Sequence, residues 1–185
     1  MNGIYLLVAF VAALLFYSFM LYNKLVRMKN RIDNAWAQVK VQLKRRWDLI
    51  PNLVSTVKGY AAHESQTLEA VTAARNAAAG SGANDIARSA QAENALTASL
   101  RQLFAVAESY PDLKANENFL ALQKELTDTE NKISYARQFY NDSVMTYDTA
   151  IQLFPANLLS GPFGFPPREY FEIDKVEEEP VKVEF

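Results

Sequence analysis

The chain has 185 residues and a net charge of −2, and half of its residues are apolar, but it contains no cysteine and only one histidine. This composition excludes disulfide bonds, thiolate metal sites, cysteine nucleophiles and His-rich metal clusters. With only 6 glycines and 7 prolines, the chain is expected to form long helices. These bounds favour one modest helical domain and point away from enzymes.

The first predicted element is a membrane anchor over residues 1–23. The run Ile4–Leu21 contains no charged side chain, and as a helix it is long enough to cross a bilayer core of about 30 Å. A cleaved signal peptide fits less well, because no Lys or Arg precedes the run, the run exceeds the usual signal core, and no A-x-A site follows it.

A basic cluster follows the anchor directly, whereas no charge precedes it. By the positive-inside rule, this asymmetry places the N-terminus outside and the body in the cytoplasm. The same side chains are expected to attract anionic membrane lipid. The cluster consists of Lys24, Arg27, Lys29 and Arg31.

The net charge changes sign along the chain. It is +7 for residues 1–58, −5 for residues 59–167 and −4 for residues 168–185. Nucleic acid is not an expected partner, because no recognition motif accompanies the basic part and the acidic tail would repel phosphate.

Residues 24–154 are predicted to form a bundle of helices. An apolar stripe that includes Trp36 and Trp47 predicts a first helix continuous with the anchor. Pro51 interrupts the pattern, so that either a second helix starts at Leu49 or one long helix kinks here, and a short break with a new start is favoured. That second helix is expected to continue to the loop at residues 80–82. A third helix is expected over residues 84–110, closed by Pro111 and Asp112.

The strongest periodicity lies in a fourth helix, predicted over residues 116–154. Apolar positions recur there every three or four residues from Phe119 to Phe154, as in a coiled coil. Only long partners can cover such a helix. We therefore expect an all-α fold: an elongated antiparallel bundle of three to four long helices that continues from the transmembrane helix.

Residues 155–185 are predicted to form an extended C-terminal segment. Proline, glycine and aromatic residues alternate up to residue 171, which argues against helix and central strand. The charged end, Glu172–Phe185, is expected to be mobile. Five side chains are expected to pack on the bundle or on a neighbouring subunit, namely Leu158, Phe163, Phe165, Tyr170 and Phe171.

No catalytic residue, metal ligand or cofactor site is expected. His63 and Glu64 begin an HExxH pattern, but position 67 is Thr67, so the second zinc ligand is missing and His63 is read as a helix-surface residue. A di-metal bundle needs a Glu-x-x-His motif on each of two helices, which one histidine cannot supply.

Several polar residues lie within or beside the apolar stripes, where burial requires a partner. We expect a structural network in which Glu130 and Arg137 face residues 45–52 across the bundle and fix the register of the helices. The alternative is a site for a small molecule or a lipid headgroup. The set comprises Lys44, Arg45, Arg46, Asp48, Asn52, Glu130, Arg137 and Asn141.

The chain resembles the LemA family over nearly its whole length. The residues that carry the resemblance are NRIDNAW-x6-LKRRWDLIPNLVSTVKGYAAHE (30–64), ENKISYAR-x2-YN-x2-V-x2-YD-x2-I-x2-FP (130–155) and GF…YFE (164–172). The resemblance implies a bacterial inner-membrane protein with one transmembrane helix and a soluble antiparallel helical bundle, but it supplies no reaction. Asp148 departs from the family pattern, where asparagine is expected, which puts in doubt any hydrogen bond that the amide would donate.

The expected function is structural: a membrane-anchored, non-enzymatic scaffold, adaptor or membrane-organising protein. Homo-oligomerisation is expected from surplus apolar surface, and parallel anchors favour cyclic symmetry about the membrane normal. Two alternatives remain open, a lipid-binding or membrane-shaping protein and a small-ligand sensor that uses the polar set between the first and last helices.

Overall fold

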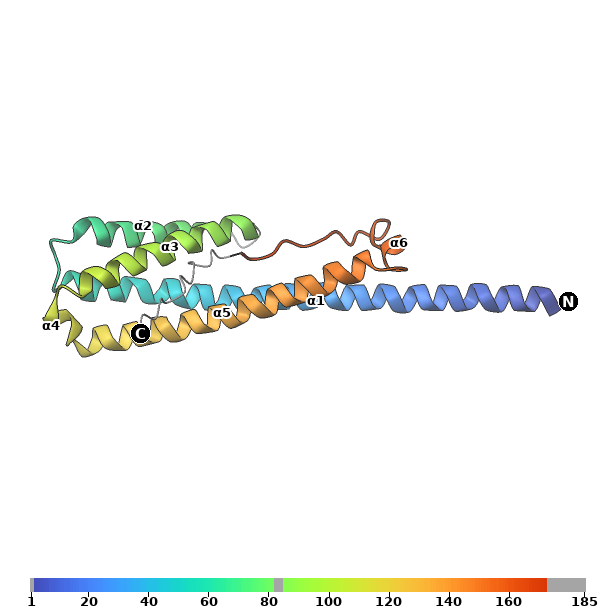
Figure 1. Ribbon diagram of the computed structural model, residues 1–185, viewed down its shortest axis with the longest axis horizontal. Coiled ribbons are helices and arrows are strands. Elements are labelled where there is room, and N and C mark those ends of the chain that lie inside the picture. The colour runs from blue at the N-terminus through green and yellow to red at the C-terminus, as the bar shows by residue number, and fades with distance from the viewer. Residues whose placement is uncertain (1, 82–84, 173–185) are drawn as a thin grey trace, which may run out of the picture. The chain divides into compact units, whose positions relative to one another are not determined.

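The computed structural model describes residues 2–81 and 85–172, and within these ranges it contains helices and no strand (Figure 1). The expected all-α fold is therefore confirmed, as is the long apolar N-terminal helix that continues into a helical body. The helices are α1 (Asn2–Lys58), α2 (Ser65–Gly80), α3 (Ile86–Ala107), α4 (Pro111–Lys114), α5 (Glu117–Gln152) and α6 (Asn157–Ser160).

The helix α1 passes through Pro51 without interruption, so the predicted break there is wrong. Proline has no N–H to donate to the carbonyl four residues earlier, which here is that of Trp47. Arg75 of α2 supplies the missing donor, since its Nε lies 3.1 Å from the Trp47 carbonyl oxygen. A contact from a distant part of the chain thus replaces the helix hydrogen bond that Pro51 cannot donate.

The chain instead turns after Lys58, within a stretch that we had predicted to be continuous helix up to residue 80. Two tight hydrogen bonds end α1, from the amide of Gly59 to the carbonyl of Thr56 (3.2 Å) and from that of Tyr60 to Val57 (3.0 Å). The exposed His63 consequently lies in this turn rather than on a helix.

The described chain forms two compact units. The first comprises residues 2–39 and 136–169, and pairs the first part of α1 with the second part of α5. Apolar side chains from both helices are buried in it, and the rings of Trp36 and Tyr140 lie 5.4 Å apart. Coverage of α1 begins at Ser18, and the preceding residues of the apolar run are exposed.

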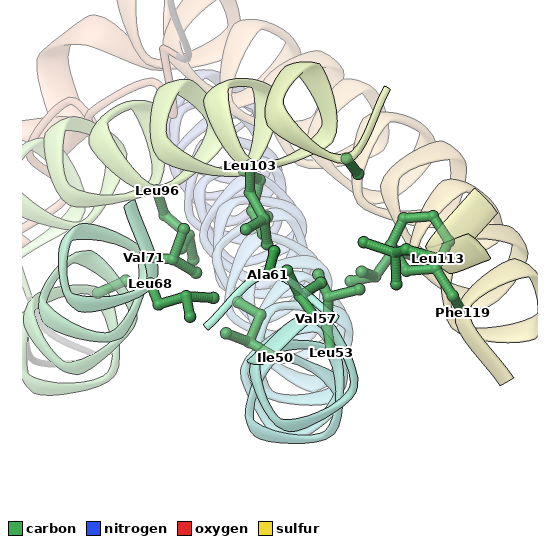
Figure 2. Close-up of a cluster of buried hydrophobic side chains, with 14 residues drawn as sticks. Ile50, Leu53, Val57, Ala61, Leu68, Val71, Leu96, Leu103, Leu113 and Phe119 are labelled. Atoms are coloured by element: carbon green, nitrogen blue, oxygen red, sulfur yellow. The ribbon is translucent and has the colours of Figure 1, made fainter. Parts of the chain in front are cut away.

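The second unit comprises residues 40–81, 85–135 and 170–172. Its helices α2 and α3 run antiparallel, side by side (Figure 1). Figure 2 shows the core that these helices share with α1, α4 and the start of α5, where buried side chains point toward one another. Labelled members are Ile50, Leu53, Val57, Ala61, Leu68, Val71, Leu96, Leu103, Leu113 and Phe119.

Polar side chains cap the starts of two helices. Asp85 accepts a hydrogen bond from the amide of Arg88 at the start of α3 (2.9 Å), and Asn116 accepts one from the amide of Phe119 at the start of α5 (3.0 Å). Pro111 was expected only to end the third helix, but it also begins the one-turn helix α4. At the first position of a helix the missing N–H of proline has no cost.

The C-terminal segment departs from the expected extended form. The single-turn helix α6 follows α5, although no helix was predicted there. Of the five side chains expected to pack, Phe165 and Phe171 are buried, whereas Leu158, Phe163 and Tyr170 are exposed. Most of the tail that we expected to be mobile, residues 173–185, lies outside the described residues.

Candidate functional site

The most deeply buried polar cluster lies in the second unit, between α1 and α3. The Glu93 side chain is fully buried and that of Arg46 is 3% exposed, with 3.2 Å between Arg46 Nη1 and Glu93 Oε2. Trp47 Nε1 donates to Glu93 Oε1 at 2.7 Å, and Arg46 Nη2 donates to Thr97 Oγ1 at 2.7 Å. Both carboxylate oxygens of Glu93 are therefore occupied. We call these four residues, together with Glu130, the Arg46 cluster.

Glu130 connects the Arg46 cluster to α5. Its Oε2 lies 3.4 Å from Arg46 Nη1, and its side chain is 48% exposed. Arg46 thus contacts one buried and one half-exposed carboxylate, from two different helices. Two buried polar atoms, Arg46 Nε and Gln42 Oε1, have no hydrogen-bond partner within the described part of the chain.

Burial raises the pKa of Glu93 above its usual value of 4.5, because a carboxylate loses its hydration there. The charge of Arg46 and the hydrogen bond from Trp47 act in the opposite direction, and the nearby Glu130 adds to the increase. The net direction shows that desolvation outweighs the favourable contacts. A buried pair of this kind is not a source of large stability by itself.

A pocket of about 340 Å³ adjoins the cluster in the same unit. Leu100, Phe104 and Leu126 form apolar walls, whereas Arg46 and Glu130 supply charged groups. Arg46 and Glu130 are engaged with each other, the exposed Arg101 also lines the pocket, and a histidine or cysteine nucleophile is absent from the lining. Elsewhere among the described residues no group of three or more His, Asp or Glu side chains is arranged to hold a metal ion.

The residues proposed from sequence for this network do not all meet. Arg46 and Glu130 are in contact, whereas Arg45 pairs with Glu125 on the surface at 3.4 Å. The remaining members lie elsewhere: Lys44 and Asp48 form an exposed pair at 2.6 Å, Asn52 is exposed, and Arg137 and Asn141 belong to the first unit.

Sequence reasoning missed Glu93, although a signal existed. Glu93 lies three residues before Leu96 and seven before Leu100, both of which were assigned to the apolar stripe of the third helix. A carboxylate at a stripe position requires a buried cation or donor. Arg46 and Trp47 meet that requirement from the first helix, 47 and 46 residues away in the chain.

A second polar cluster holds the C-terminal segment against α5 within the first unit. The hydroxyl of Tyr140 donates to the carbonyl oxygen of Glu169 at 2.7 Å, and that of Tyr147 donates to the carbonyl oxygen of Pro166 at 3.0 Å. Asp148 Oδ1 accepts from the amide of Arg168 at 3.1 Å. The oxygen of Asp148 acts here as an acceptor, a role that needs no amide donor.

Burial also raises the pKa values of the two tyrosines in this second cluster. It raises the pKa of Tyr140 to about 12 and raises that of Tyr147 in the same direction, while the nearby charge of Arg168 opposes both shifts. Arg168 additionally pairs with Asp33 of α1, with 3.3 Å between Nη2 and Oδ1.

The basic cluster after the anchor belongs to the first unit and lies largely at the surface. Lys24, Arg27 and Arg31 are exposed and Lys29 is half-buried. The guanidinium of Arg31 lies 5.1 Å from the centre of the Phe139 ring, a cation–π distance. The other basic groups remain accessible to solvent or to a membrane surface.

Together these features define a class of protein: an all-α, membrane-associated protein whose N-terminal helix is long and apolar enough to cross a bilayer. The sequence profile of the LemA family matches residues 35–185, and the chain belongs to the LemA family.

Curated relatives agree with this assignment. The chain is 27% identical to "Magnetosome protein MamQ 2" of Paramagnetospirillum magneticum, over 89% of this chain and 68% of the relative. It has the same identity and coverage with "Magnetosome protein MamQ" of Magnetospirillum gryphiswaldense. It is 26% identical to "Protein LemA" of Metamycoplasma hominis, over 75% of this chain and 63% of that protein.

Proposed function

We propose that this protein is a non-enzymatic scaffold or adaptor that organises the bacterial inner membrane and self-assembles through its helical body. In this proposal α1 crosses the membrane once, with the N-terminus outside and the body in the cytoplasm. The observation that carries the proposal is the continuity of α1, which runs from Asn2 to Lys58 as one helix.

The continuity of α1 leaves no linker between anchor and body. The same helix carries the exposed apolar run and, farther along, core residues such as Ile50 and Leu53 of the second unit. An enzyme that is merely tethered to a membrane needs no such shared element. A helix that supplies both the anchor and core residues of the body favours a structural role.

Exposed apolar side chains on the body support self-assembly. Val41 and Tyr135 of the second unit and Met145 of the first are each more than half exposed, and Tyr135 reaches 74%. A partner that covers such side chains removes apolar surface from water, which lowers the free energy of the assembly. Anchoring identical chains in one membrane raises their effective concentration, and parallel anchors favour cyclic symmetry about the membrane normal.

The names of the relatives are compatible with this proposal. Two of those reported above are named for the magnetosome and one for the LemA family, and neither name denotes a reaction. A role in organising a membrane-bound assembly accommodates both kinds of name.

Self-assembly is tested by cross-linking the full-length protein in native membranes and by measuring its mass in mild detergent. We expect species larger than a monomer in both, and a smaller oligomeric fraction for Tyr135→Asp. Ser134→Asp is the matched control, because Ser134 is an exposed polar neighbour in the same helix turn. A monomer in both measurements contradicts self-assembly.

A second candidate function, lipid binding or membrane shaping by the basic cluster, rests on the exposure of Lys24, Arg27 and Arg31. Each charge near an anionic surface contributes about 1 kcal/mol. Protein reconstituted in vesicles should recruit or bend anionic membranes more than neutral ones, and the difference should fall as salt increases. Equal behaviour on both lipids would contradict this candidate.

A further inference from the structure

We propose that residues 153–163 form a second membrane contact, an interfacial loop that inserts its apolar side chains between lipid headgroups and acyl chains. We call this segment the interfacial loop. The inference rests on the part of the proposed function in which α1 spans the membrane, and it is independent of self-assembly and of orientation.

The composition of the loop suits a lipid environment. No charged side chain occurs between Ile151 and Pro167. The loop nevertheless leaves four large apolar side chains more than half exposed to solvent, whereas apolar side chains of the core are almost fully buried. These are Leu153 (60% exposed), Phe154 (80%), Leu158 (64%) and Phe163 (56%).

The loop lies at the end of the apolar run of α1. The ring of Tyr22 is 5.5 Å from the ring of Phe163 and 5.5 Å from that of Phe165, both in edge-to-face geometry. Tyr22 directly follows the run Ile4–Leu21 and precedes Lys24, the first charged residue. Figure 1 shows α6 and the loop beside α1 within this unit.

This position sets the depth of the loop. If Ile4–Leu21 fills the hydrocarbon core, Tyr22 lies at the headgroup level, where aromatic side chains are enriched at membrane surfaces. Ser18 and Leu21 of the apolar run are half-buried, and Phe163 and Phe165 of the C-terminal segment pack against Tyr22 directly after the run. The exposed side chains of the loop are then placed at the boundary between headgroups and acyl chains.

Backbone groups of the loop are hydrogen-bonded within the loop and its flanking residues, as a region poor in water requires. Unpaired amides and carbonyls are costly there, so irregular backbone needs internal partners. Hydrogen bonds close the loop on itself: the amide of Ser160 donates to Ala156 (2.9 Å), that of Phe163 to Leu159 (3.1 Å) and that of Phe165 to Ser160 (2.8 Å).

The second polar cluster holds the loop in place. After Gly164, whose φ of 69° favours glycine, the chain returns along α5 and is held by Tyr147, Tyr140 and Asp148. These bonds fix the chain that leaves the loop to α5, the helix that leads into it. A lipid surface is favoured over a second copy of the chain as the occupant, because the loop adjoins the membrane-spanning run itself.

The absence of cysteine from the native chain gives a direct test. Single-cysteine variants Phe154→Cys and Leu158→Cys of the full-length protein are labelled with an environment-sensitive fluorophore and reconstituted in phosphatidylcholine–phosphatidylglycerol vesicles. Nitroxide lipids that place the quencher near the headgroups, or deep in the chains, report the depth. We expect a blue-shifted emission that the shallow quencher reduces most.

Two control positions separate the outcomes. Leu120→Cys labels an exposed leucine in the second unit and should be insensitive to both quenchers, whereas Leu14→Cys labels the apolar run and should respond to the deep one. Quenching at Leu14 but not at Phe154 or Leu158 would overturn the interfacial loop and leave the anchor intact. A blue shift at the loop without lipid quenching would also overturn it, since protein would then cover the loop. If Leu14 itself is not quenched, the anchor fails, and the inference fails with it.

Discussion

Glu93 is buried beside one cation and one indole N–H, so its removal takes the buried carboxylate away from Arg46 and the acceptor away from Trp47. We predict that Glu93→Leu lowers the free energy of unfolding by about 3 kcal/mol, because Arg46 then remains buried with only the half-exposed Glu130. Chemical denaturation of the detergent-solubilised protein measures this change.

Two further variants give this prediction its control. Glu125→Leu breaks only the surface pair with Arg45 and should cost less than about 1 kcal/mol. The double variant Arg46→Met with Glu93→Leu should recover most of the loss, because it removes both buried charges. Equal costs for Glu93→Leu and Glu125→Leu would show that Glu93 is not a buried partner.

The raised pKa of Tyr140 leads us to predict that the folded protein loses stability at alkaline pH. Its pKa is about 12 in the folded protein against 10 ordinarily, so the folded state holds the phenol proton more tightly than the unfolded state does. The stability that this contributes is fully present below pH 10 and is lost as the pH rises from 10 through about 12. Unfolding followed against pH should show this decline, and Tyr140→Phe should reduce it.

At neutral pH, Tyr140→Phe should cost about 1 kcal/mol, because the hydrogen bond to the Glu169 carbonyl is lost. Tyr135→Phe is the matched control, since Tyr135 is exposed and lies in the same helix. A decline of unchanged size in Tyr140→Phe would exclude Tyr140 as its source.

Among the elements, α1 depends on a contact from another helix at Pro51. We predict that Arg75→Met costs about 1–2 kcal/mol, because the Trp47 carbonyl then lacks an N–H partner. In a Pro51→Ala background the loss should nearly vanish, since the backbone amide that alanine restores at this position can donate to that carbonyl in the ordinary helical way. Unfolding free energies of the four proteins form a double-mutant cycle.

The cycle has a clear opposite outcome. If the two substitutions are additive within about 0.5 kcal/mol, Arg75 does not replace the helix hydrogen bond. Arg88→Met, at an exposed position of α3, is the control for losing an arginine side chain and should show no coupling to Pro51→Ala.

The helices themselves could be predicted because their apolar spacing is a local property of the sequence. The predicted range 116–154 agrees with α5 to within two residues at the C-terminal end and one at the N-terminal end. The turn at residues 59–64 could not be predicted in this way, because the periodicity continues through it. That turn is stabilised when Leu68 and Val71 pack on Ile50 and Leu53, which local spacing does not report.

The candidate site was predictable only in part for the same reason. Arg46 and Glu130 were recognised as polar residues within apolar stripes, but the principal partner of Arg46 is Glu93, 47 residues along the chain. Without a distance between helices, the sequence cannot choose among several carboxylates. The exposed side chains of residues 153–163 show a further limit, since spacing identifies apolar residues but not those that remain uncovered.

For the molecule as a whole, charge asymmetry sets the expected orientation. Residues 1–23 carry no charge, whereas the basic cluster begins at Lys24, directly after the apolar run. Basic residues within about 15–20 residues of a span dominate topology. We predict that a fluorescent protein fused after Phe185 is bright in bacterial cells and that alkaline phosphatase fused at the same point is inactive.

Charge removal tests the cause of this orientation. Replacing the basic cluster with glutamine should yield a mixed population in which some phosphatase fusions become active, because the positive-inside signal is then weakened at its source. Replacing four distant basic residues should leave the phosphatase inactive, since they lie beyond the range over which loop charge acts. An active phosphatase on the unaltered chain would place the body outside and contradict the orientation. The distant residues are Arg101, Lys114, Lys124 and Lys132.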